Sequence, residues 1–549
     1  MATFDSGAAS TVAPVTAESV AYENGELVIA ATATAPEFRI SDDEILFIAG
    51  FQEHGSPLEK YRLCWLREQV AVTGNAAASS DSATQEQSSS PGTPSEQFAF
   101  FSAVLNESAI RELPKEVLER HILSGSGPVK QVESSASPSS PSLHVIVSTG
   151  SGLGQSQAFY DSVLRPLFSV FGLVEVTESG DSVPEGQIPY NLLVTKNSRS
   201  ITEFAQTLDK SSAKIASTPT TIVLLSGDGG VIDLLNGMAE QDEAVDVTQL
   251  PAVALLPLGT GNALFHSLHR PDYLAAAAAA AAAASNQKEN GKAMPKGPSS
   301  FVLGLRALFK GCATPLPNFE AHFSPGSHTV SYSLQEEEGG QSTLKERAED
   351  VGRLRGAIVA SYGFHAQLVW ESDTPEYRKH GDKRFGMAAQ ELLKTSYAYN
   401  ADVKFTKAGS AASATCQLSR RFNYVLASMV SNLEKTFTIS PASEPLDGQL
   451  RLIYFGDVGG TKTMDIMMAA YNNGAHVGMR WTSAAGGGDS EEQAEESVGY
   501  DAIDELQVNV LEPDARWRKV CIDGTIVEIP QGGWMKVRKA PMPVLQIIV

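Results

Sequence analysis

The sequence predicts an α/β fold with a doubly wound, mostly parallel sheet, followed by a β-rich region of β-sandwich type and preceded by an N-terminal extension. Two neighbouring stretches carry most of this prediction. Residues 221–238 (TIVLLSGDGGVIDLLNGM) and 250–268 (LPAVALLPLGTGNALFHSL) each start as an apolar run, then pass through a turn of small residues into helical apolar spacing. Such runs are typical of parallel strands that are buried on both faces and connected by helices.

Two more strand–turn–helix units precede these stretches. The first has a strand at His144–Val147, a glycine-rich turn at Ser148–Gly154 and a helix at Ala158–Phe171. The second has a strand at Tyr190–Val194 and a helix at Ser200–Leu208. Four alternating units predict a parallel sheet, and such sheets bind ligands at the carboxyl ends of their strands. We assign this α/β domain to residues 143–300, with a polyalanine run at Ala275–Ala284 as an inserted loop near its end.

The character of the sequence changes at Phe301. Short segments of alternating polarity predict an antiparallel, β-rich domain over residues 301–549, whose C-terminal strands can return to the first domain. We expect helices at residues 343–350, 375–397 and 461–474. The predicted strands lie within residues 321–334, 355–364, 401–407, 421–430, 450–456, 521–530, 533–539 and 544–549.

The N-terminal extension, residues 23–142, contains ordered segments separated by low-complexity linkers. Residues 1–22 are rich in Ala, Ser and Thr and are predicted to be disordered, and linkers are expected at 73–96 and 124–142. We expect strands at 26–35, 44–51 and 98–105, an amphipathic helix at 56–70 and a helix at 112–123. The extension is a regulatory module, a set of extra strands on the catalytic domain or a membrane-facing surface, and its sequence does not decide among these.

The composition excludes several classes of function. A formal net charge of −22 argues against a general nucleic-acid binder, which needs clustered Lys and Arg. Four widely separated cysteines without CxxC spacing predict a reducing compartment, with neither a disulfide framework nor a zinc site. We see no secretory signal and no run of about 18 apolar residues, so we expect a cytoplasmic protein with peripheral contact to intracellular membranes.

Three glycine-rich turns at successive strand ends point to phosphate chemistry. Glycines at 150, 152 and 154 let the backbone approach a phosphate, although an ordinary flexible loop is an equal alternative. In SGDGG, Asp228 stands at a strand tip, where a carboxylate can order Mg²⁺ or accept a proton; the alternative is a helix N-cap. In GTGN, Thr260 and Asn262 add hydrogen-bonding groups, with a helix cap as the alternative. The P-loop pattern GxxxxGK[ST] is absent.

These motifs together resemble a known family. SGDGGVIDLLNGM followed by LPLGTGNAL resembles the catalytic domain of the diacylglycerol kinase and sphingosine kinase superfamily, whose fold is related to NAD kinases and phosphofructokinases. STGSGLG, with a helix ending in RPLF, is similar to the first nucleotide loop, and SYGFHAQLVWESDTPEYRKHGDKRFG to the segment after the hinge in sphingosine and ceramide kinases. PLDGQLRLI and CIDGTIVEI resemble two later motifs, so the resemblance runs from about His144 to the C-terminus.

The resemblance implies an ATP- and Mg²⁺-binding cleft between the two domains and a lipid hydroxyl as phosphoryl acceptor. Asp228 matches the catalytic acid/base carboxylate and is a candidate metal ligand. Ser226, Gln367 and Val369 match substrate-binding positions, and Phe364, Leu368 and Trp370 are candidates for a lipid-tail pocket. The implied nucleotide-binding residues are Ser148, Thr149, Gly150, Gly152, Thr195, Gly227, Gly229, Asp233, Gly259, Thr260, Gly261, Asn262, Arg378, Arg384, Asp523 and Gly524. For the two arginines, a surface ion pair with Glu376 or Asp382 is the alternative.

The chain departs from the family pattern at several positions. Ser148-Thr149 replaces the usual Asn-Pro, Asp233 stands where a Glu is usual, and Thr525 replaces the Glu of a DGE motif. Gln367 and Val369 occupy places where sphingosine kinases carry acidic residues, which argues against recognition of a cationic amine. Three hypotheses remain: a lipid kinase, a nucleotide- or lipid-binding protein without turnover, and a soluble-substrate kinase of the NAD kinase type. The YR…RF segment favours the lipid branch over the last.

Overall fold

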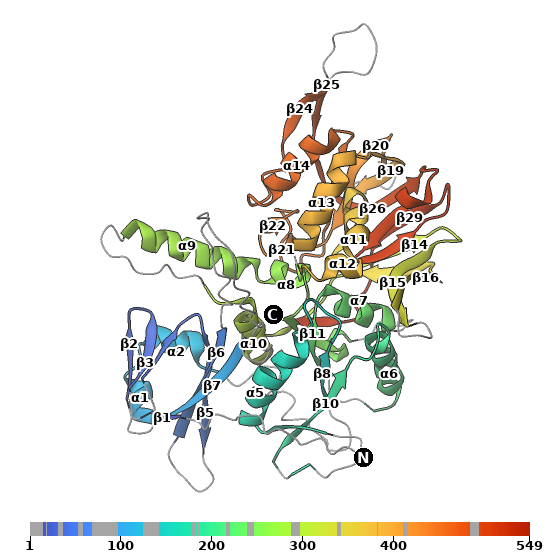
Figure 1. Cartoon of the computed structure of the whole chain (residues 1–549). Coiled ribbons are helices and arrows are strands. Elements are labelled where there is room, and N and C mark those ends of the chain that lie inside the picture. Colours follow the sequence, from blue (N-terminus) through green and yellow to red (C-terminus); the bar gives the residue numbers. More distant parts are fainter. Residues whose placement is uncertain are drawn as a thin grey trace, which may run out of the picture.

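The fold has three parts: an N-terminal extension, an α/β domain and a β-rich domain. In Figure 1 the first is blue, the second is mainly teal to green and the third is yellow to red. The computed structural model describes residues 15–17, 19–30, 37–52, 59–68, 97–123, 142–176, 183–184, 186–215, 220–238, 246–286, 297–336, 342–381, 383–409, 415–483 and 494–549, and every statement below concerns these residues. The predicted linkers (73–96 and, except for residue 142, 124–142) and most of the predicted disordered start (1–22) lie outside them. The prediction of disorder is wrong for the end of that start, which forms β1 (Val15–Ala17) and part of β2 (Val20–Glu23).

The central part is a seven-stranded sheet with strand order β13-β30-β12-β11-β8-β10-β9. Its strands pair in parallel except at the β13–β30 edge. Every residue of β11 is buried, as expected for a strand covered on both faces. The last strand of the chain, β30, pairs in parallel with β12, so the C-terminal residues belong to this first sheet.

Helices cover both faces of this sheet, which makes it doubly wound. On one face, α4, η2, α5 and α10 share a core with β8, β11 and β12. On the other face, α6, α7 and α8 pack against alternate residues of the same strands. The elements are β8 (Leu143–Val147), α4 (Ser156–Phe159), the π-helix η2 (Tyr160–Leu164), α5 (Arg165–Val170), β9 (Leu173–Glu175), β10 (Ile188–Val194), α6 (Ser200–Ile215), β11 (Thr221–Ser226), α7 (Asp228–Gly237), η3 (Val247–Gln249), β12 (Ala252–Pro257), α8 (Ala263–Leu268), α9 (Arg270–Asn286), α10 (Ser300–Lys310), β13 (Ala313–Pro315) and β30 (Gln546–Ile548).

The polyalanine run is helical rather than a loop. It lies in α9, which projects from the body of the molecule in Figure 1. Alanine has the highest intrinsic helix propensity, so this stretch forms a helix with few tertiary contacts.

The N-terminal part contains a four-stranded sheet (β1-β7-β6-β5) and a three-stranded sheet (β2-β3-β4). The helix predicted at 56–70 is wrong, because this segment forms the strand β6 between β5 and β7. Leu63 and Trp65 face one core while Cys64 and Leu66 face another, and burial on both faces hides the alternation that marks a strand. The elements are β1 (Val15–Ala17), β2 (Val20–Glu23), β3 (Glu26–Ile29), β4 (Phe38–Ser41), β5 (Ile45–Gln52), β6 (Glu59–Glu68), β7 (Phe98–Leu105), α1 (Glu107–Arg111) and α2 (Lys115–His121).

This extension packs directly on the α/β domain. The Phe47 ring lies 4.7 Å from the Phe309 ring, centroid to centroid, and the Phe98 ring lies 5.1 Å from that of Phe159. Arg306 of α10 donates to the carbonyl oxygen of Ile45 at 2.6 Å and to that of Asp42 at 2.8 Å. The strands of the extension therefore pack on the α/β domain, and a regulatory or membrane-facing role of the extension stays a prediction.

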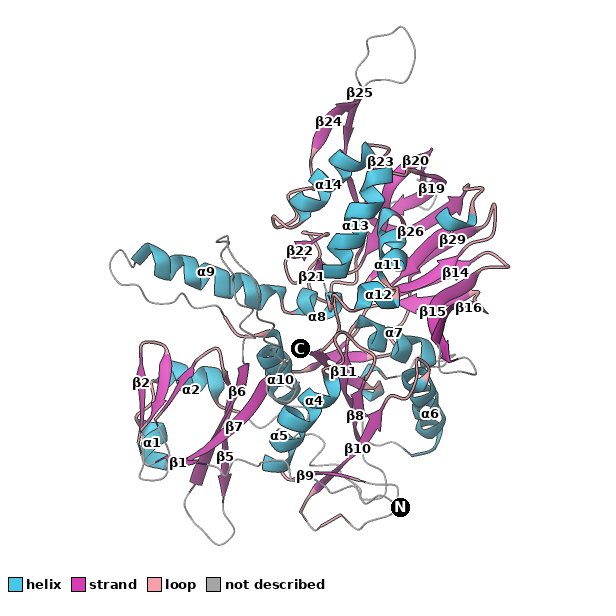
Figure 2. Cartoon of the chain, viewed as in Figure 1, coloured by secondary structure: helices cyan, strands magenta, loops and turns pink. Residues whose placement is uncertain are grey.

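The β-rich part is a twelve-stranded sheet that folds over on itself around a common core, and Figure 2 shows its strands beside α11 and α13. The helix predicted at 343–350 is wrong, because this segment is the edge strand β16, paired along its whole length with β15. Its charged composition resembles that of an exposed helix, but an exposed edge strand is charged as well. The elements are β14 (Phe319–Phe323), β15 (His328–Glu336), β16 (Ser342–Asp350), β17 (Arg353–Gly356), β18 (Val359–Gly363), α11 (Phe364–Ser372), α12 (Pro375–Arg378), α13 (Lys383–Thr395), β19 (Tyr399–Lys407), β20 (Thr415–Ser428), β21 (Asn432–Glu434), β22 (Phe437–Thr438), β23 (Leu450–Gly456), α14 (Gly459–Ala470), β24 (Arg480–Ser483), β25 (Ala494–Ser497), β26 (Gly499–Val510), η4 (Ala515–Trp517), β27 (Lys519–Ile522), β28 (Thr525–Glu528) and β29 (Trp534–Lys539).

Candidate functional site

The three glycine-rich turns lie against one another at the carboxyl edge of the seven-stranded sheet. A Cβ atom added at Gly227 would lie 2.8 Å from the Cα atom of Gly259, and one added at Gly152 would lie 2.5 Å from the carbonyl oxygen of Leu258. Gly152 also has a φ of +53°, in the left-handed region. Side chains are excluded at these positions because backbone meets backbone there. The turns after β8, β11 and β12 therefore form one surface.

Hydroxyl groups tie these turns together. The Ser151 Oγ lies 2.9 Å from the Ser226 Oγ and accepts a hydrogen bond from the Gly227 amide at 3.3 Å. The Thr149 amide donates to the Thr195 Oγ1 at 3.0 Å. Ser226 and Thr195, predicted to contact substrate and nucleotide, thus have structural partners in the loops; their contact with a ligand stays a prediction. Sequence reasoning missed Ser151, whose hydroxyl joins the first two turns.

Asp228 caps the helix that follows the third turn. Its Oδ2 accepts a hydrogen bond from the Ala263 amide at 2.7 Å and its Oδ1 one from the Leu264 amide at 3.1 Å. The cap considered from the sequence was that of its own helix, but Gly227 is the N-cap of α7 and Asp228 caps α8 instead. Burial of the carboxyl group raises its pKa above the ordinary aspartate value. Asp228 thus joins the second turn to the third and is a better proton acceptor than a solvated aspartate.

The third turn is shaped by Asn262, which has a left-handed φ of +52°. Its Oδ1 accepts from the Gly259 amide at 3.0 Å and its Nδ2 donates to the Gly259 carbonyl oxygen at 3.0 Å. The Asn262 side chain therefore supports the loop itself. Gly261 lies beside Asp228, where an added Cβ would be 3.9 Å from its Oδ2.

Two glycines of the turns border open space. At Gly150 and Gly229 an added Cβ would meet no atom within 4 Å, so these backbone segments face open space. The helix α7 starts here without a side-chain cap. The first amides of a helix have no partner within the helix, and together with the helix dipole they favour an anion. The residues present therefore fit the phosphates of a nucleotide.

The β-rich part contributes a second carboxylate, Asp523, in the turn between β27 and β28. It accepts hydrogen bonds from the amides of Ala357 and Val359 at 2.6 and 2.5 Å, and also from that of Ile358. Burial raises the Asp523 pKa to about 7, and the neighbouring Asp228 carboxylate adds to the shift. Asp228 of the α/β domain and Asp523 of the β-rich domain are thus near enough for their charges to interact. Sequence reasoning missed the amides at 357–359, since backbone donors leave no mark in side-chain patterns.

The third carboxylate, Asp233, lies on the same face of α7 as Gly229 and Asn236, since these positions are spaced four and three residues apart. Asp233 is half-buried, and burial raises its pKa to about 7. In the turn formed by Asp523, Gly524 and Thr525, Gly524 has a φ of +94°. Glu528 does not replace the glutamate missing at Thr525, because it pairs with Lys519 at 3.3 Å.

The two predicted phosphate-binding arginines share one partner. Arg378 Nη2 lies 2.6 Å from Asp373 Oδ2, and Arg384 Nη1 lies 3.2 Å from Asp373 Oδ1. The predicted ion pair with Glu376 is therefore replaced by Asp373, and Asp382 lies outside the described residues. The Arg384 Nε is buried and has no hydrogen-bond partner within the described part of the chain. An unused buried donor of this kind suits an anion that is bound only during function.

The arginine segment reaches the first glycine turn. Gly381 lies between the two arginines, and a Cβ added there would be 3.3 Å from Leu153 Cδ2. Leu153 follows Gly152 in the first turn and is 65% exposed. The segment that carries the arginines thus lies against the first glycine turn, and a nucleotide cleft shared by the two stays a prediction.

The predicted acceptor residues on α11 do not form one group. Gln367 and Val369 are two positions apart, so they point to nearly opposite sides of the helix. Trp370 stacks on Tyr332 with ring centroids 4.3 Å apart, in a separate cluster from Phe364 and Leu368. Gln367 is 1% exposed, and its Oε1 is buried without a hydrogen-bond partner among the described residues. These substrate-binding assignments stay predictions.

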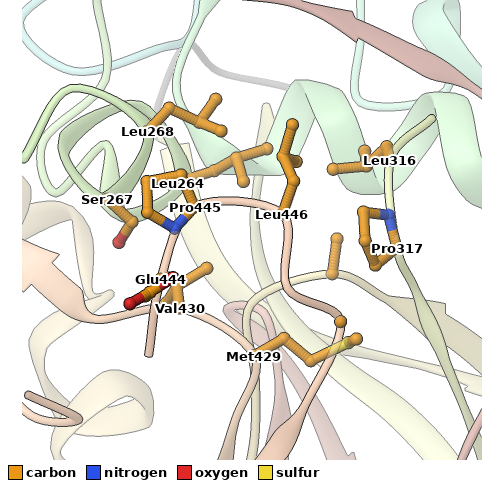
Figure 3. A pocket seen from close by; sticks show the side chains of 12 residues that line it. Leu264, Ser267, Leu268, Leu316, Pro317, Met429, Val430, Glu444, Pro445 and Leu446 are labelled. Carbon is orange, nitrogen blue, oxygen red and sulfur yellow. The ribbon is translucent and has the colours of Figure 1, made fainter. Parts of the chain in front are cut away.

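A small, mostly apolar pocket lies between the two domains, and Figure 3 shows the side chains that line it. Leu264 and Ala357 line it, and their amides bind Asp228 and Asp523 respectively. The sequence could not reveal this cavity, because its walls come from segments far apart in the chain. The lining residues are Leu264, Ser267, Leu268, Leu316, Pro317, Ala357, Met429, Val430, Glu444, Pro445, Leu446 and Gly448.

A metal ion would need the nucleotide to complete its ligands. Among the described residues, no group of three or more His, Cys, Asp or Glu side chains is arranged to hold one. Mg²⁺ in phosphoryl-transfer sites is commonly bound by one or two carboxylates together with phosphate oxygens and water, which fits a site with Asp228 beside the phosphate surface. The predicted role of Asp228 as a metal ligand stays a prediction. The described residues also contain no helix long and apolar enough to cross a membrane.

Comparison with known proteins bears on this arrangement. Residues 142–293 match the family model of the diacylglycerol kinase catalytic domain. Among solved structures, a diacylglycerol kinase from Bacillus anthracis str. Sterne has 15% identity and a TM-score of 0.40, covering 74% of this chain and 96% of its own. Two others from that bacterium, described as candidates for this activity, have 14% identity each and TM-scores of 0.39 and 0.38; each covers 74% of this chain, and 94% and 97% of their own chains.

A search of curated proteins gave no match. The family match spans the four units that build the seven-stranded sheet, including all three glycine-rich turns and Asp228. Residues 142–293 are therefore similar to the diacylglycerol kinase catalytic domain, which supports the resemblance of the chain to the superfamily of diacylglycerol and sphingosine kinases.

Proposed function

We propose that this protein is an ATP-dependent lipid kinase that phosphorylates a hydroxyl of a sphingoid base, ceramide, diacylglycerol or a related lipid. One observation carries the proposal: Asp228 stands where three glycine-rich turns meet, within the segment that matches the diacylglycerol kinase catalytic domain. Backbone amides of the turns bind the phosphates, and the carboxylate lies beside them.

In the proposed reaction, the acceptor hydroxyl oxygen forms a bond to the γ-phosphorus while the bond from that phosphorus to the β–γ bridging oxygen breaks, which releases ADP. The hydroxyl proton passes to the Asp228 carboxylate, whose pKa is raised by burial. Mg²⁺ bound with the nucleotide neutralises phosphate charge. Catalysis of this kind consists mostly of positioning and electrostatic stabilisation.

The two arginines can stabilise the negative charge that develops on the phosphates during transfer. Arg378 and Arg384 are held together by Asp373, and Arg384 retains an unused Nε donor. A guanidinium group can bind two phosphate oxygens at once, so the arginine segment can hold the triphosphate from the β-rich side while the glycine turns hold it from the other side.

The acceptor is proposed to be a lipid with an uncharged headgroup. Gln367 is buried on α11 and offers an uncharged oxygen, whereas a protonated amine is best held by a carboxylate. The match to the diacylglycerol kinase catalytic domain supports an acceptor with an apolar portion. Such a substrate resides in a membrane, so we propose peripheral binding of the protein to intracellular membranes from the cytoplasm.

A second candidate is a nucleotide-binding protein without turnover. Both Asp228 oxygens already accept amide hydrogen bonds, and Thr525 replaces a carboxylate expected near the nucleotide. A protein of this kind binds ATP with the same loops but transfers no phosphate.

The deciding experiment is a transfer assay with radiolabelled ATP over sphingosine, phytosphingosine, ceramide and diacylglycerol, with ATP binding measured in parallel. We expect label on at least one lipid, and a loss of at least about 100-fold in Asp228→Asn, because the proton acceptor is removed. Asp465→Asn, an exposed aspartate on α14, is the matched control. ATP binding without labelled lipid would establish the second candidate, and an active Asp228→Asn variant would refute the assigned mechanism.

A further inference from the structure

The end of α7 is fastened to the β-rich domain by one arginine and one asparagine. Arg355 Nη1 donates to the carbonyl oxygens of Leu235 at 3.3 Å and Met238 at 2.8 Å, at the C-terminal end of the helix. The Asn236 side chain accepts from the Arg355 amide at 2.9 Å and donates to the Arg355 carbonyl oxygen at 3.0 Å. Arg355 is 7% exposed, so this contact is shielded from water.

The chemistry of this contact is strong and directional. The last carbonyl groups of a helix have no partner within the helix and carry the negative end of its dipole, which a guanidinium group satisfies. The amide of Asn236 pairs with both backbone groups of Arg355, so sliding along β17 would break two hydrogen bonds at once. Rotation and translation of α7 relative to β17 are therefore both restricted.

The other end of α7 carries the reacting carboxylate. The helix runs from Asp228 to Gly237, about 15 Å at 1.5 Å per residue. A helix of this length is rigid, so the position of its C-terminal end relative to the β-rich domain also sets the position of Asp228. The helix α7 thus rigidly connects the contact at Arg355 with the Asp228 carboxylate.

The strand β17, which contacts the end of α7, continues into the segment whose amides bind Asp523. Arg355 lies in β17, and the next residues are Gly356 and then Ala357–Val359, whose amides bind Asp523. A Cβ at Gly356 would lie 2.9 Å from the Asp523 Oδ2, so the strand passes close to this carboxylate. The single segment 355–359 therefore contacts both α7 and Asp523.

We propose that Arg355 and Asn236 are positioning residues that hold Asp228 of one domain opposite Asp523 of the other. This inference rests on the proposed function, because it assigns the two carboxylates to one reaction site. Neither residue touches the reacting atoms.

Loss of the contact should misalign the domains rather than separate them. The two domains also meet at α8, where Ser267 Oγ donates to the Asn432 carbonyl oxygen at 3.1 Å, and at Arg270, which donates to the Pro441 carbonyl oxygen at 3.0 Å. These hydrogen bonds are independent of Arg355. We call the hydrogen bonds that Arg355 and Asn236 make between β17 and the end of α7 the clamp. Variants at the clamp should therefore remain folded and retain the glycine turns.

The test compares Arg355→Met, Arg355→Lys and Asn236→Leu with the control Arg353→Met in the full-length protein. Arg353 lies on the same strand, but its Nη1 pairs with Glu320 at 3.5 Å rather than with the carbonyl groups of α7 that Arg355 binds. We expect kcat for lipid phosphorylation to fall about 10- to 100-fold in Arg355→Met and Asn236→Leu, with the Kd for ATP within about 2-fold of the wild type, because small misplacements of reacting groups cost this much. Arg355→Lys should be intermediate, since it restores the charge but not the planar donor group.

Amide hydrogen exchange provides a readout that does not need turnover. In the clamp variants we expect faster exchange at residues 263–264 and 357–359, whose amides hold the two carboxylates, and no change in β8 or β11. If Arg355→Met fails to fold, Asn236→Leu carries the test. Wild-type kcat in folded clamp variants would overturn the proposal, as would a parallel loss of kcat, ATP binding and thermal stability. If the wild type labels no lipid, the proposed function fails, whereas the exchange data still decide whether the clamp aligns the carboxylates.

Discussion

The two domains build their halves of the site from different material. The α/β domain supplies backbone: glycine turns that touch one another and are open to space at Gly150 and Gly229. The β-rich domain supplies charged side chains that already have partners, namely Asp523 with three amides and two arginines with Asp373. Substitutions that change the shape of the glycine turns should therefore abolish ATP binding. Substitutions that change charge in the β-rich domain should weaken or strengthen ATP binding in smaller steps.

The largest expected effect is steric. Gly259→Ala places a methyl group against the Cα atom of Gly227 and within 2.8 Å of the Asn262 Oδ1, neither of which can move without opening the turns. Because the nucleotide surface depends on this contact, we expect ATP affinity measured by calorimetry to fall at least about 100-fold, a difference near 2.8 kcal/mol. Gly352→Ala is the control, because an added Cβ there meets nothing within 4 Å and its φ is ordinary. Normal ATP binding by Gly259→Ala would remove the distinction between the two halves.

A smaller, graded effect is expected from charge. Arg384→Gln should weaken ATP binding about 10-fold, the scale of one hydrogen bond to a charged group, while the apo protein stays folded. Arg516→Gln, which removes an exposed ion pair with Glu371, should leave ATP binding unchanged.

Asp373→Asn should act in the opposite direction and tighten ATP binding about 2- to 5-fold, because a carboxylate no longer competes with phosphate for the arginines. Weaker binding in Asp373→Asn would mean that Asp373 mainly orients the arginines.

The smallest effect concerns pH and belongs to the α/β half. The pKa of Asp233 is raised from 3.8 to about 7 in the folded protein, so the folded state binds more protons than the unfolded state between these values. Stability contributed by this group is present below pH 4 and is lost as the pH rises towards 7. Asp233→Asn should therefore raise the Tm at pH 8 by about 2–4 °C and leave it nearly unchanged at pH 4. The exposed Asp465→Asn should shift neither value, and an equal gain at both pH values in Asp233→Asn would show that its charge is not the cause.

The same contrast explains how much could be predicted from the sequence. The strands β8, β11 and β12 with their turns are contiguous apolar runs ending in glycine, so local pattern alone predicts them and places Asp228 at a strand end. Their convergence follows from parallel topology. The arginine segment was predictable only through resemblance to a family, because nothing local distinguishes Arg384 from a surface arginine.

The remaining features depend on contacts between distant segments. The strands β6 and β16 were predicted as helices, because one is buried on both faces and the other is charged throughout, and only their pairing partners make them strands. Asp373, the amides that hold Asp523 and the Arg355 contact each join segments that no spacing rule connects. Trp370 lies in a different apolar cluster from Phe364 and Leu368, although all three are on α11, and their predicted role in a lipid pocket stays a prediction.

The place of β30 has a consequence for biosynthesis. This strand pairs with β12 at Ala252 and Val253, although the whole β-rich domain is translated between them. On the ribosome, β12 therefore remains an open sheet edge until the last residues emerge, at a rate of about 5–20 residues per second. Open edges attract other strands, so the nascent catalytic domain is exposed to misassociation during this interval. A change at residues 546–548 would therefore act on the seven-stranded sheet itself, although these residues lie far from β12 in the sequence.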